Sequence, residues 1–277
     1  MMNDIQNELL PFVKTRQYKQ FKETCDFVRS RRKIGLAYGE AGTGKSSAAR
    51  QYATEQPPLA VNGVSPVFYL ELEQTDKTDR AFYNTLVGAI LHQPPENVTA
   101  KVASNEAKRL IDKYQFDMII LDEFHFLQDS GLEAVRTLWD KIGIGIMLVT
   151  MTQFRSVLQK TKHLQLHSRI IRFHPFDRLD EKQIRRELLP RVTTNSGITF
   201  DPEQKDADEI IQALLKATQG NFRRIVKVLD EASYLIELSI EENQLYEAGR
   251  IKQQPQPILQ FSAEVILEAA ARTEDMG

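Results

Sequence analysis

The sequence is poor in cysteine and in long apolar runs. Its 277 residues include one cysteine, Cys25. A single thiol excludes an intramolecular disulfide and a zinc site built from several cysteines. No apolar run is long enough to span a bilayer, and residues 1–11 lack the basic-then-apolar layout of a signal peptide. These absences predict a cytoplasmic protein with a buried, reduced thiol and no membrane partner.

The chain as a whole also lacks an excess of positive or negative charge. The 36 Lys and Arg residues against 38 Asp and Glu residues give a net charge of −2, so the total charge does not indicate a nucleic-acid binder. Residues 14–33 are nevertheless rich in lysine and arginine. This stretch is either the solvated face of a helix or a functional basic surface.

Short buried runs alternate with helical patterns through the first two thirds of the chain. This alternation predicts an α/β fold, a parallel sheet covered by helices on both faces. After Pro175 only helical periodicity remains, which predicts a smaller helical part. We expect a basic helical lead at 1–32, an α/β domain at 33–174, and a helical lid with a C-terminal helix at 175–277. The expected strands cover 34–38, 67–72, 118–121, 145–150 and 170–173, and the expected helices between them cover 46–55, 79–91, 105–114 and 132–141.

A glycine-rich loop follows the first expected strand and opens the first of these helices. Its sequence GEAGTGKS matches the pattern G-x-x-x-x-G-K-[ST], in which backbone N–H groups and a helix N-terminus surround phosphates. Lys45 is expected to reach the β- and γ-phosphates, and the Ser46 hydroxyl to ligate Mg²⁺. The pattern predicts ATP and Mg²⁺ as cofactors. The nucleotide-binding residues are Gly39, Glu40, Ala41, Gly42, Thr43, Gly44, Lys45, Ser46 and Ser47.

Two acidic residues follow the buried run 118–121. In a parallel sheet Asp122 and Glu123 would lie at the carboxyl edge, beside the phosphate loop. Asp122 is expected to hold the Mg²⁺ shell, and Glu123 to orient or deprotonate the attacking water. His125 is either a relay from the nucleotide to a neighbour or a packing residue.

Later segments resemble the AAA+ ATPases, and among them the transposition regulators TnsC, TniB and MuB. The region from Leu10 to Ser46 is similar to their entry region, DMIILDEFHFL to their Walker B segment, and IGIMLVTMTQF to their sensor 1 strand. HSRIIRF resembles the arginine-finger segment, and ATQGNFRRIVKVLDEA the sensor 2 helix of the lid. The resemblance implies a P-loop AAA+ sheet with a small C-terminal helical lid.

The resemblance also implies roles for residues outside the phosphate loop. Thr150 or Thr152 would be sensor 1, although either threonine could equally cap the end of its strand. Arg169, with Arg172 as the alternative, would reach the γ-phosphate of a neighbouring subunit, which makes hydrolysis depend on assembly. Arg223 or Arg224 would be sensor 2. The alternative interpretation places these arginines on solvated helix faces.

The resemblance implies a regulator of DNA transposition that hydrolyses ATP. It would assemble on duplex DNA as a ring or a helical filament with six subunits per turn, mark a target site, and recruit a transposase and a targeting adaptor. In a bacterial cell it would be cytoplasmic, and at the nucleoid when active. A helicase loader, a replication initiator, and a signalling NTPase that does not bind DNA are the alternatives. The expected DNA contacts, which hold phosphates without reading bases, are Thr75, Lys77, Thr78, Arg80, Thr99 and Lys101.

Overall fold

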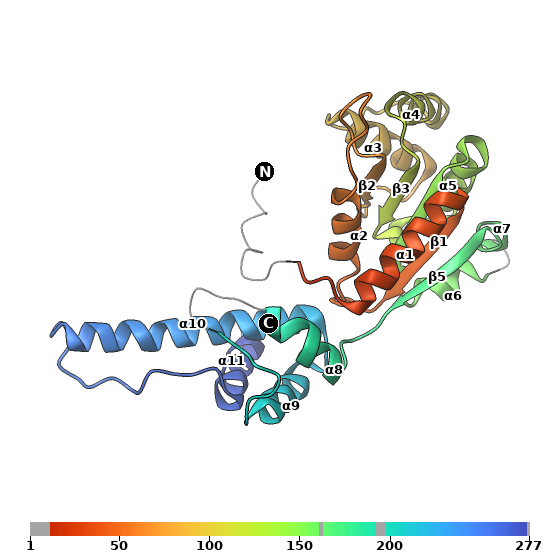
Figure 1. The fold of residues 1–277 in the computed structure, drawn as a ribbon. Coiled ribbons are helices and arrows are strands. Elements are labelled where there is room, and N and C mark those ends of the chain that lie inside the picture. The colour runs from red at the N-terminus through yellow and green to blue at the C-terminus, as the bar shows by residue number, and fades with distance from the viewer. Residues whose placement is uncertain (1–11, 161–162, 192–197, 276–277) are drawn as a thin grey trace. The chain divides into compact units, whose positions relative to one another are not determined.

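The structure is a computed structural model, and it describes residues 12–160, 163–191 and 198–275. The chain forms two compact units (Figure 1). One unit, the sheet unit, is Gln17–Phe176. The other, the helical unit, combines the described residues up to Arg16 with those from Asp177 onward.

The sheet unit contains five parallel strands in the order β2-β3-β4-β1-β5, which confirms the predicted parallel sheet. Since all the strands run in one direction, their carboxyl ends meet at one edge. The loops that carry the predicted phosphate and Mg²⁺ ligands therefore leave the sheet at the same edge. The strands are β1 (Ile34–Gly39), β2 (Val67–Glu71), β3 (Met118–Asp122), β4 (Gly145–Met151) and β5 (Ile170–Phe176).

Helices cover both faces of this sheet. Along β3, Met118 and Ile120 face one apolar cluster, which includes residues of α1 and α2, whereas Ile119 and Leu121 face another, which includes residues of α3, α4 and α5. Burial on both faces explains why the strand is a continuous apolar run. The helices of this unit are α1 (Arg16–Arg31), α2 (Lys45–Thr54), α3 (Asp79–Leu91), α4 (Ala100–Tyr114), η2 (Phe124–Phe126), α5 (Asp129–Ile142), α6 (Phe154–Leu158) and α7 (Leu164–His167).

The basic N-terminal helix α1 packs on the sheet. Its apolar face includes Phe21 and Cys25, both fully buried, and burial raises the pKa of the Cys25 thiol well above its usual value. Arg29 donates to both carboxylate oxygens of Asp117, over 2.7 and 2.8 Å. The structure thus groups α1 with the sheet, whereas the sequence set 1–32 apart as a lead. Residues 1–11 of that lead lie outside the described residues.

Several element boundaries differ from the expected ones, and two of the differences have a clear physical reason. β5 continues through Pro175 to Phe176, although the proline was expected to follow the strand. Within the described part of the chain β5 is an edge strand, paired with β1 alone, and a proline without an N–H group is tolerated there. α4 begins at Ala100, five residues before the expected start at Asn105, because the Thr99 hydroxyl caps it by accepting the N–H of Val102.

The helical unit packs around its own apolar cluster. No strand occurs in the described residues of this unit, which confirms the predicted change to helices after the sheet. Ile210, Leu214, Ile225 and Ile266 are fully buried in its core. Within the described residues no helix is both long and apolar enough to cross a bilayer. The elements are α8 (Glu181–Gln183), η4 (Ile184–Leu188), η5 (Leu189–Arg191), α9 (Ala207–Thr218), α10 (Phe222–Glu247) and α11 (Ala263–Asp275).

The turn between α9 and α10 depends on Gly220, which has a φ of +72°. Its carbonyl accepts the N–H of Leu179 over 2.8 Å, and a Cβ at this position would lie 2.2 Å from the Leu179 carbonyl oxygen. Gly249 has a similar φ of +68°, but no atom lies within 4 Å of the place where its Cβ would be.

We therefore expect Gly220→Ala to destabilise the protein more than Gly249→Ala. Both changes introduce a left-handed alanine, at about 1–2 kcal/mol, and only the first adds a steric overlap, at about 1–3 kcal/mol. Urea unfolding of the two full-length variants measures the difference. Equal losses of unfolding free energy would show that the Leu179 contact does not restrict Gly220.

Candidate functional site

The predicted phosphate loop joins β1 to α2. Gly39 approaches β5 so closely that a Cβ would lie 2.4 Å from the carbonyl oxygen of Phe176. Gly42 and Gly44 have φ values of +77° and +91°, which favour glycine. α2 then begins at Lys45 without a side-chain cap. This is the arrangement in which the first N–H groups of a helix face a bound anion.

The ammonium group of Lys45 lies against this loop. The residue is 7% exposed, and its Nζ donates to the carbonyl oxygens of Gly39 at 3.0 Å and Glu40 at 2.7 Å. Such a buried ammonium group requires acceptors, and phosphate oxygens are suitable ones. Thr43 fixes the loop by donating to the Glu40 carbonyl over 2.9 Å. The loop thus fits a nucleotide phosphate, and all residues from Gly39 to Ser47 lie in it or in the first turn of α2.

The Asp122 carboxylate is held at the end of β3, where it is 1% exposed. Its Oδ1 accepts the N–H of Glu123 at 2.8 Å, and its Oδ2 accepts the hydroxyl of Tyr69 at 2.7 Å. Burial, followed by the charge and the hydrogen bond of Asp122, raises the pKa of Tyr69 above its usual range. The hydroxyl therefore keeps its proton. The carboxylate suits Mg²⁺, which prefers oxygen ligands.

Glu123 follows in a left-handed conformation, with a φ of +52°. Such a backbone costs a non-glycine residue of the order of 1–3 kcal/mol, and residues of this kind occur at functional sites as well as at helix ends, where His92 and Gln115 have it in this chain. Oε2 of Glu123 lies 3.2 Å from Nδ1 of His125, but the two groups are not aligned as a hydrogen bond. Both residues line an open cavity of about 610 Å³. Its other residues are Glu71, Leu72, Glu73, Gln74, Phe126 and Met151.

The structure distinguishes the two sensor 1 candidates at the end of β4. Thr150 is fully buried, and its hydroxyl oxygen has no hydrogen-bond partner among the described residues. Thr152 lies past the strand and is exposed. A buried hydroxyl without a partner is costly, so a ligand would be a suitable partner for Thr150.

The predicted arginine finger forms contacts within its own chain. Arg169 donates to both carboxylate oxygens of Asp140, at 2.9 and 3.1 Å, and to the carbonyl of Gln165 at 2.5 Å. The exposed guanidinium of Arg172, the alternative candidate, lies 4.2 Å from the ring centroid of Phe27. A role toward a neighbouring subunit would require Arg169 to leave Asp140.

The sensor 2 candidates lie in the helical unit. Arg223 and Arg224 are exposed in the first turn of α10, where the side chain of Asn221 accepts the N–H of Arg224 at 3.2 Å. Their approach to a nucleotide stays a prediction, because the phosphate loop belongs to the sheet unit.

The predicted DNA contacts gather near the starts of α3 and α4. Arg80 donates to the carbonyls of Asn97 and Val98, over 3.1 and 3.0 Å, so the first turn of α3 is joined to the segment that leads into α4. The Thr78 hydroxyl caps α3 as the Thr99 hydroxyl caps α4. All six predicted contacts are exposed, namely Thr75, Lys77, Thr78, Arg80, Thr99 and Lys101.

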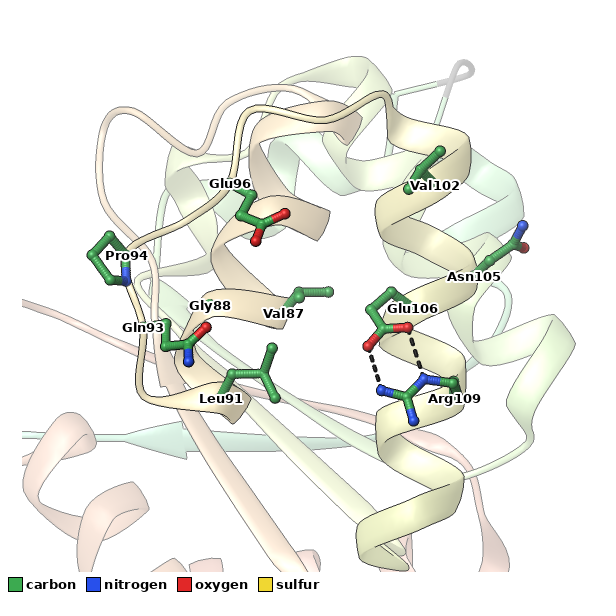
Figure 2. Close-up of a pocket in the computed structure, with 10 residues that line it drawn as sticks. All are labelled: Val87, Gly88, Leu91, Gln93, Pro94, Glu96, Val102, Asn105, Glu106 and Arg109. Atoms are coloured by element: carbon green, nitrogen blue, oxygen red, sulfur yellow. Dashed lines mark hydrogen bonds and ion pairs between the residues drawn. The ribbon is translucent and has the colours of Figure 1, made fainter.

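A second cavity, of about 530 Å³, lies between α3 and α4 (Figure 2). Its wall includes Val87, Leu91 and Val102, and the Glu106 carboxylate in it accepts two hydrogen bonds from Arg109. None of the predicted site residues lines this cavity.

The sequence did not single out Tyr69 or Arg50, although both belong to the site. Tyr69 pairs with Ile120 in the β2–β3 ladder, two residues before Asp122, and it therefore shares a face with the carboxylate. Arg50, on α2, donates to the Tyr69 hydroxyl at 3.1 Å. Only knowledge that β2 lies beside β3, and in which register, could have indicated this contact.

Comparisons with known proteins agree with this geometry. Residues 28–158 match the family described as AAA domain. A potential ATP-binding protein of Staphylococcus aureus is 25% identical over 250 residues, which cover 82% of this chain and 90% of that protein.

Solved structures resemble the chain over nearly its whole length. The ADP form of the Aeropyrum pernix ORC2 protein matches with a TM-score of 0.62 and 14% identity, over 96% of this chain and 70% of that one. The Aeropyrum pernix ORC1 protein in complex with DNA matches with a TM-score of 0.62 and 16% identity, over 97% and 68%. These matches do not distinguish TnsC, TniB and MuB from other AAA+ proteins, so membership of that group stays a prediction. The chain has the AAA+ P-loop fold with a C-terminal helical part, carries an AAA domain match over residues 28–158, and is structurally similar to ORC-type proteins.

Proposed function

We propose that this protein is a Mg²⁺-dependent ATPase. The observation that carries the proposal is the buried Lys45 in a glycine loop, on the same sheet edge as the buried Asp122 and Thr150, whose hydroxyl has no partner in the described part of the chain. Ser46 and Asp122 would hold Mg²⁺, which when bound offsets the charge on the phosphates. Glu123 would orient the attacking water, or accept its proton.

The first test separates binding from turnover. Lys45→Ala should abolish ATP binding, because it removes the cation of the loop. Glu123→Gln should retain binding and lower kcat by about 10²–10⁴-fold, the usual contribution of a general base. Equilibrium binding of a fluorescent ATP analogue and phosphate release measure the two effects. Wild-type turnover in Glu123→Gln would show that another residue acts on the water.

A second prediction concerns Thr150, proposed as sensor 1. Thr150→Val keeps the shape of the side chain and removes a hydroxyl that has no partner among the residues the structure describes, so the melting temperature should stay the same or rise. If the hydroxyl donates to the γ-phosphate or the water, kcat should fall about 10²–10³-fold, as on loss of one such donor. Thr152→Val is the matched control. A larger effect of the control on kcat would transfer the role to Thr152.

We infer further that ATP controls binding to duplex DNA. The Arg80 hydrogen bonds bring Lys77 and Lys101 to neighbouring helix starts, where N–H groups and lysines suit phosphates. The capping hydroxyls of Thr78 and Thr99 accept within the protein and can still donate to a phosphate. The similarity to an ORC1 protein solved with DNA also favours this proposal.

Hydrogen bonds connect the start of α3, near which predicted DNA contacts lie, to the segment that follows the acidic end of β3. The N–H of Gln128, five residues after Glu123, donates to the Lys77 carbonyl at 2.9 Å. The N–H of Asp79 donates to the Ser130 hydroxyl at 3.3 Å. In this proposal these contacts carry a change at Glu123 on nucleotide binding to the loop that contains Lys77.

The third prediction concerns DNA affinity. With a net charge of −2, one subunit neutralises few phosphates, so tight binding should require several subunits assembled with ATP. Titration of duplex DNA should show affinity that requires ATP, falls with salt and varies little with sequence. Lys77→Glu and Lys101→Glu should weaken it without affecting ATP binding.

The matched control for this prediction is Lys108→Glu. Lys108 is exposed on α4, beyond its first turn, and the substitution changes the net charge by the same amount. Equal affinity with and without ATP would contradict the assembly proposal. Absence of DNA binding in both conditions would favour the signalling NTPase.

The biological role we propose is regulation of transposition, which rests on the motif resemblance. The protein would assemble on DNA, present Arg169 to a neighbouring subunit, and recruit a transposase and a targeting adaptor. The second candidate, a replication initiator or helicase loader, is favoured by the similarity to ORC proteins. Co-purification from the native cell separates the two roles, because the first predicts a transposase and the second predicts helicase components.

A further inference from the structure

The hydroxyl of Tyr69 lies between a cation and the predicted Mg²⁺ ligand. Arg50 Nε is 3.1 Å from the hydroxyl oxygen, which is 2.7 Å from Oδ2 of Asp122. A guanidinium group can only donate, and a carboxylate can only accept. The direction of both hydrogen bonds is therefore fixed, from Arg50 to Tyr69 and from Tyr69 to Asp122.

The three residues come from three different elements. Arg50 lies on α2, the helix that begins at the phosphate loop, Tyr69 on β2, and Asp122 at the end of β3. Arg50 is fixed by a second contact, from Nη2 to Oε2 of Glu71 at 2.6 Å. Its guanidinium carbon also lies 5.6 Å from the centroid of the Tyr69 ring. The chain of contacts thus links the phosphate-loop helix to the acidic strand end.

As a hydrogen-bond donor to Asp122, the neutral hydroxyl of Tyr69 has an advantage over a charged group. An arginine paired directly with Asp122 would offset the negative charge that a divalent cation needs. Tyr69 instead fixes the orientation of the carboxylate and leaves its charge in place, while Glu71 balances the charge of Arg50. Oδ1 of Asp122 is oriented by the N–H of Glu123 at 2.8 Å. Both oxygens are therefore positioned by neutral groups.

We propose that Tyr69, held by Arg50, is a positioning residue that orients the Asp122 carboxylate for the Mg²⁺ that accompanies the nucleotide. The inference rests on the proposed ATPase function. Groups that orient metal ligands contribute about 10–100-fold to metal affinity or activity. In this proposal Tyr69 acts through Asp122, so its removal should alter the response to metal more than the binding of nucleotide itself.

The test is Tyr69→Phe, which removes one oxygen atom and keeps the ring. Binding of a fluorescent ATP analogue is measured in EDTA and across a Mg²⁺ titration. Affinity in EDTA should equal that of the wild type, whereas the Mg²⁺ concentration at half-maximal response should rise about 10–100-fold. The Mg²⁺ dependence of phosphate release should shift by the same factor, and saturating Mg²⁺ should restore most of kcat.

Tyr52→Phe is the matched control. The Tyr52 hydroxyl also donates to a carboxylate, Oδ1 of Asp26 at 2.8 Å, but in the contact between α2 and α1. This variant should titrate with Mg²⁺ as the wild type does. An equal shift in both variants would reveal a general weakening of the fold and overturn the assignment of Tyr69.

Arg50→Gln provides a second measurement. Arg50 is an exposed residue, so its replacement should leave the fold intact even if Tyr69→Phe does not fold. It should shift the Mg²⁺ midpoint in the same direction by a smaller factor. If the wild type responds to Mg²⁺ and neither variant shifts the midpoint, the inference is wrong and the ATPase proposal stands. If the wild type does not bind nucleotide, the ATPase proposal itself fails.

Discussion

The buried ammonium group of Lys45 is the constraint on which the site depends. A cation that is 7% exposed must be surrounded by acceptors, and in this structure they include the carbonyls of Gly39 and Glu40. Gly39 can present its carbonyl there because it has no Cβ to collide with Phe176 of β5. The position of Lys45 therefore depends on Gly39, and that of Gly39 depends on how closely β5 packs beside it.

The parallel sheet adds the acidic half of the site. Because β1, β3 and β4 end at the same edge, Asp122, Glu123 and Thr150 lie at the edge of the sheet from which the phosphate loop leaves. Each of these residues has a burial, a backbone conformation or an unsatisfied hydroxyl that packing of the fold alone does not explain. Asp122 is almost completely buried, Glu123 has a positive φ, and the Thr150 hydroxyl has no partner in the described parts of the chain. A bound nucleotide with its Mg²⁺ would account for all three.

The sequence predicted those parts of the fold and the site that depend on local patterns. The buried runs at 34–38 and 118–121 predicted two central strands, and the loop at 39–46 predicted a turn before a helix. Contacts between distant residues could not be predicted, because they depend on strand order and register. Tyr69 reaches Asp122 across 53 positions of sequence, and Arg169 reaches Asp140 across 29. Pro175 similarly remains in a strand only because β5 lies at the edge.

The most direct test of the account is an experimental structure of the protein with Mg²⁺ and a non-hydrolysable ATP analogue. The account predicts that the phosphates lie at the start of α2 and that Lys45 Nζ moves from the carbonyls of Gly39 and Glu40 to phosphate oxygens. Thr150 and Asp122 should then face the terminal phosphate and the metal. A nucleotide bound elsewhere, or a Lys45 that keeps both carbonyl contacts and touches no phosphate, would contradict the account.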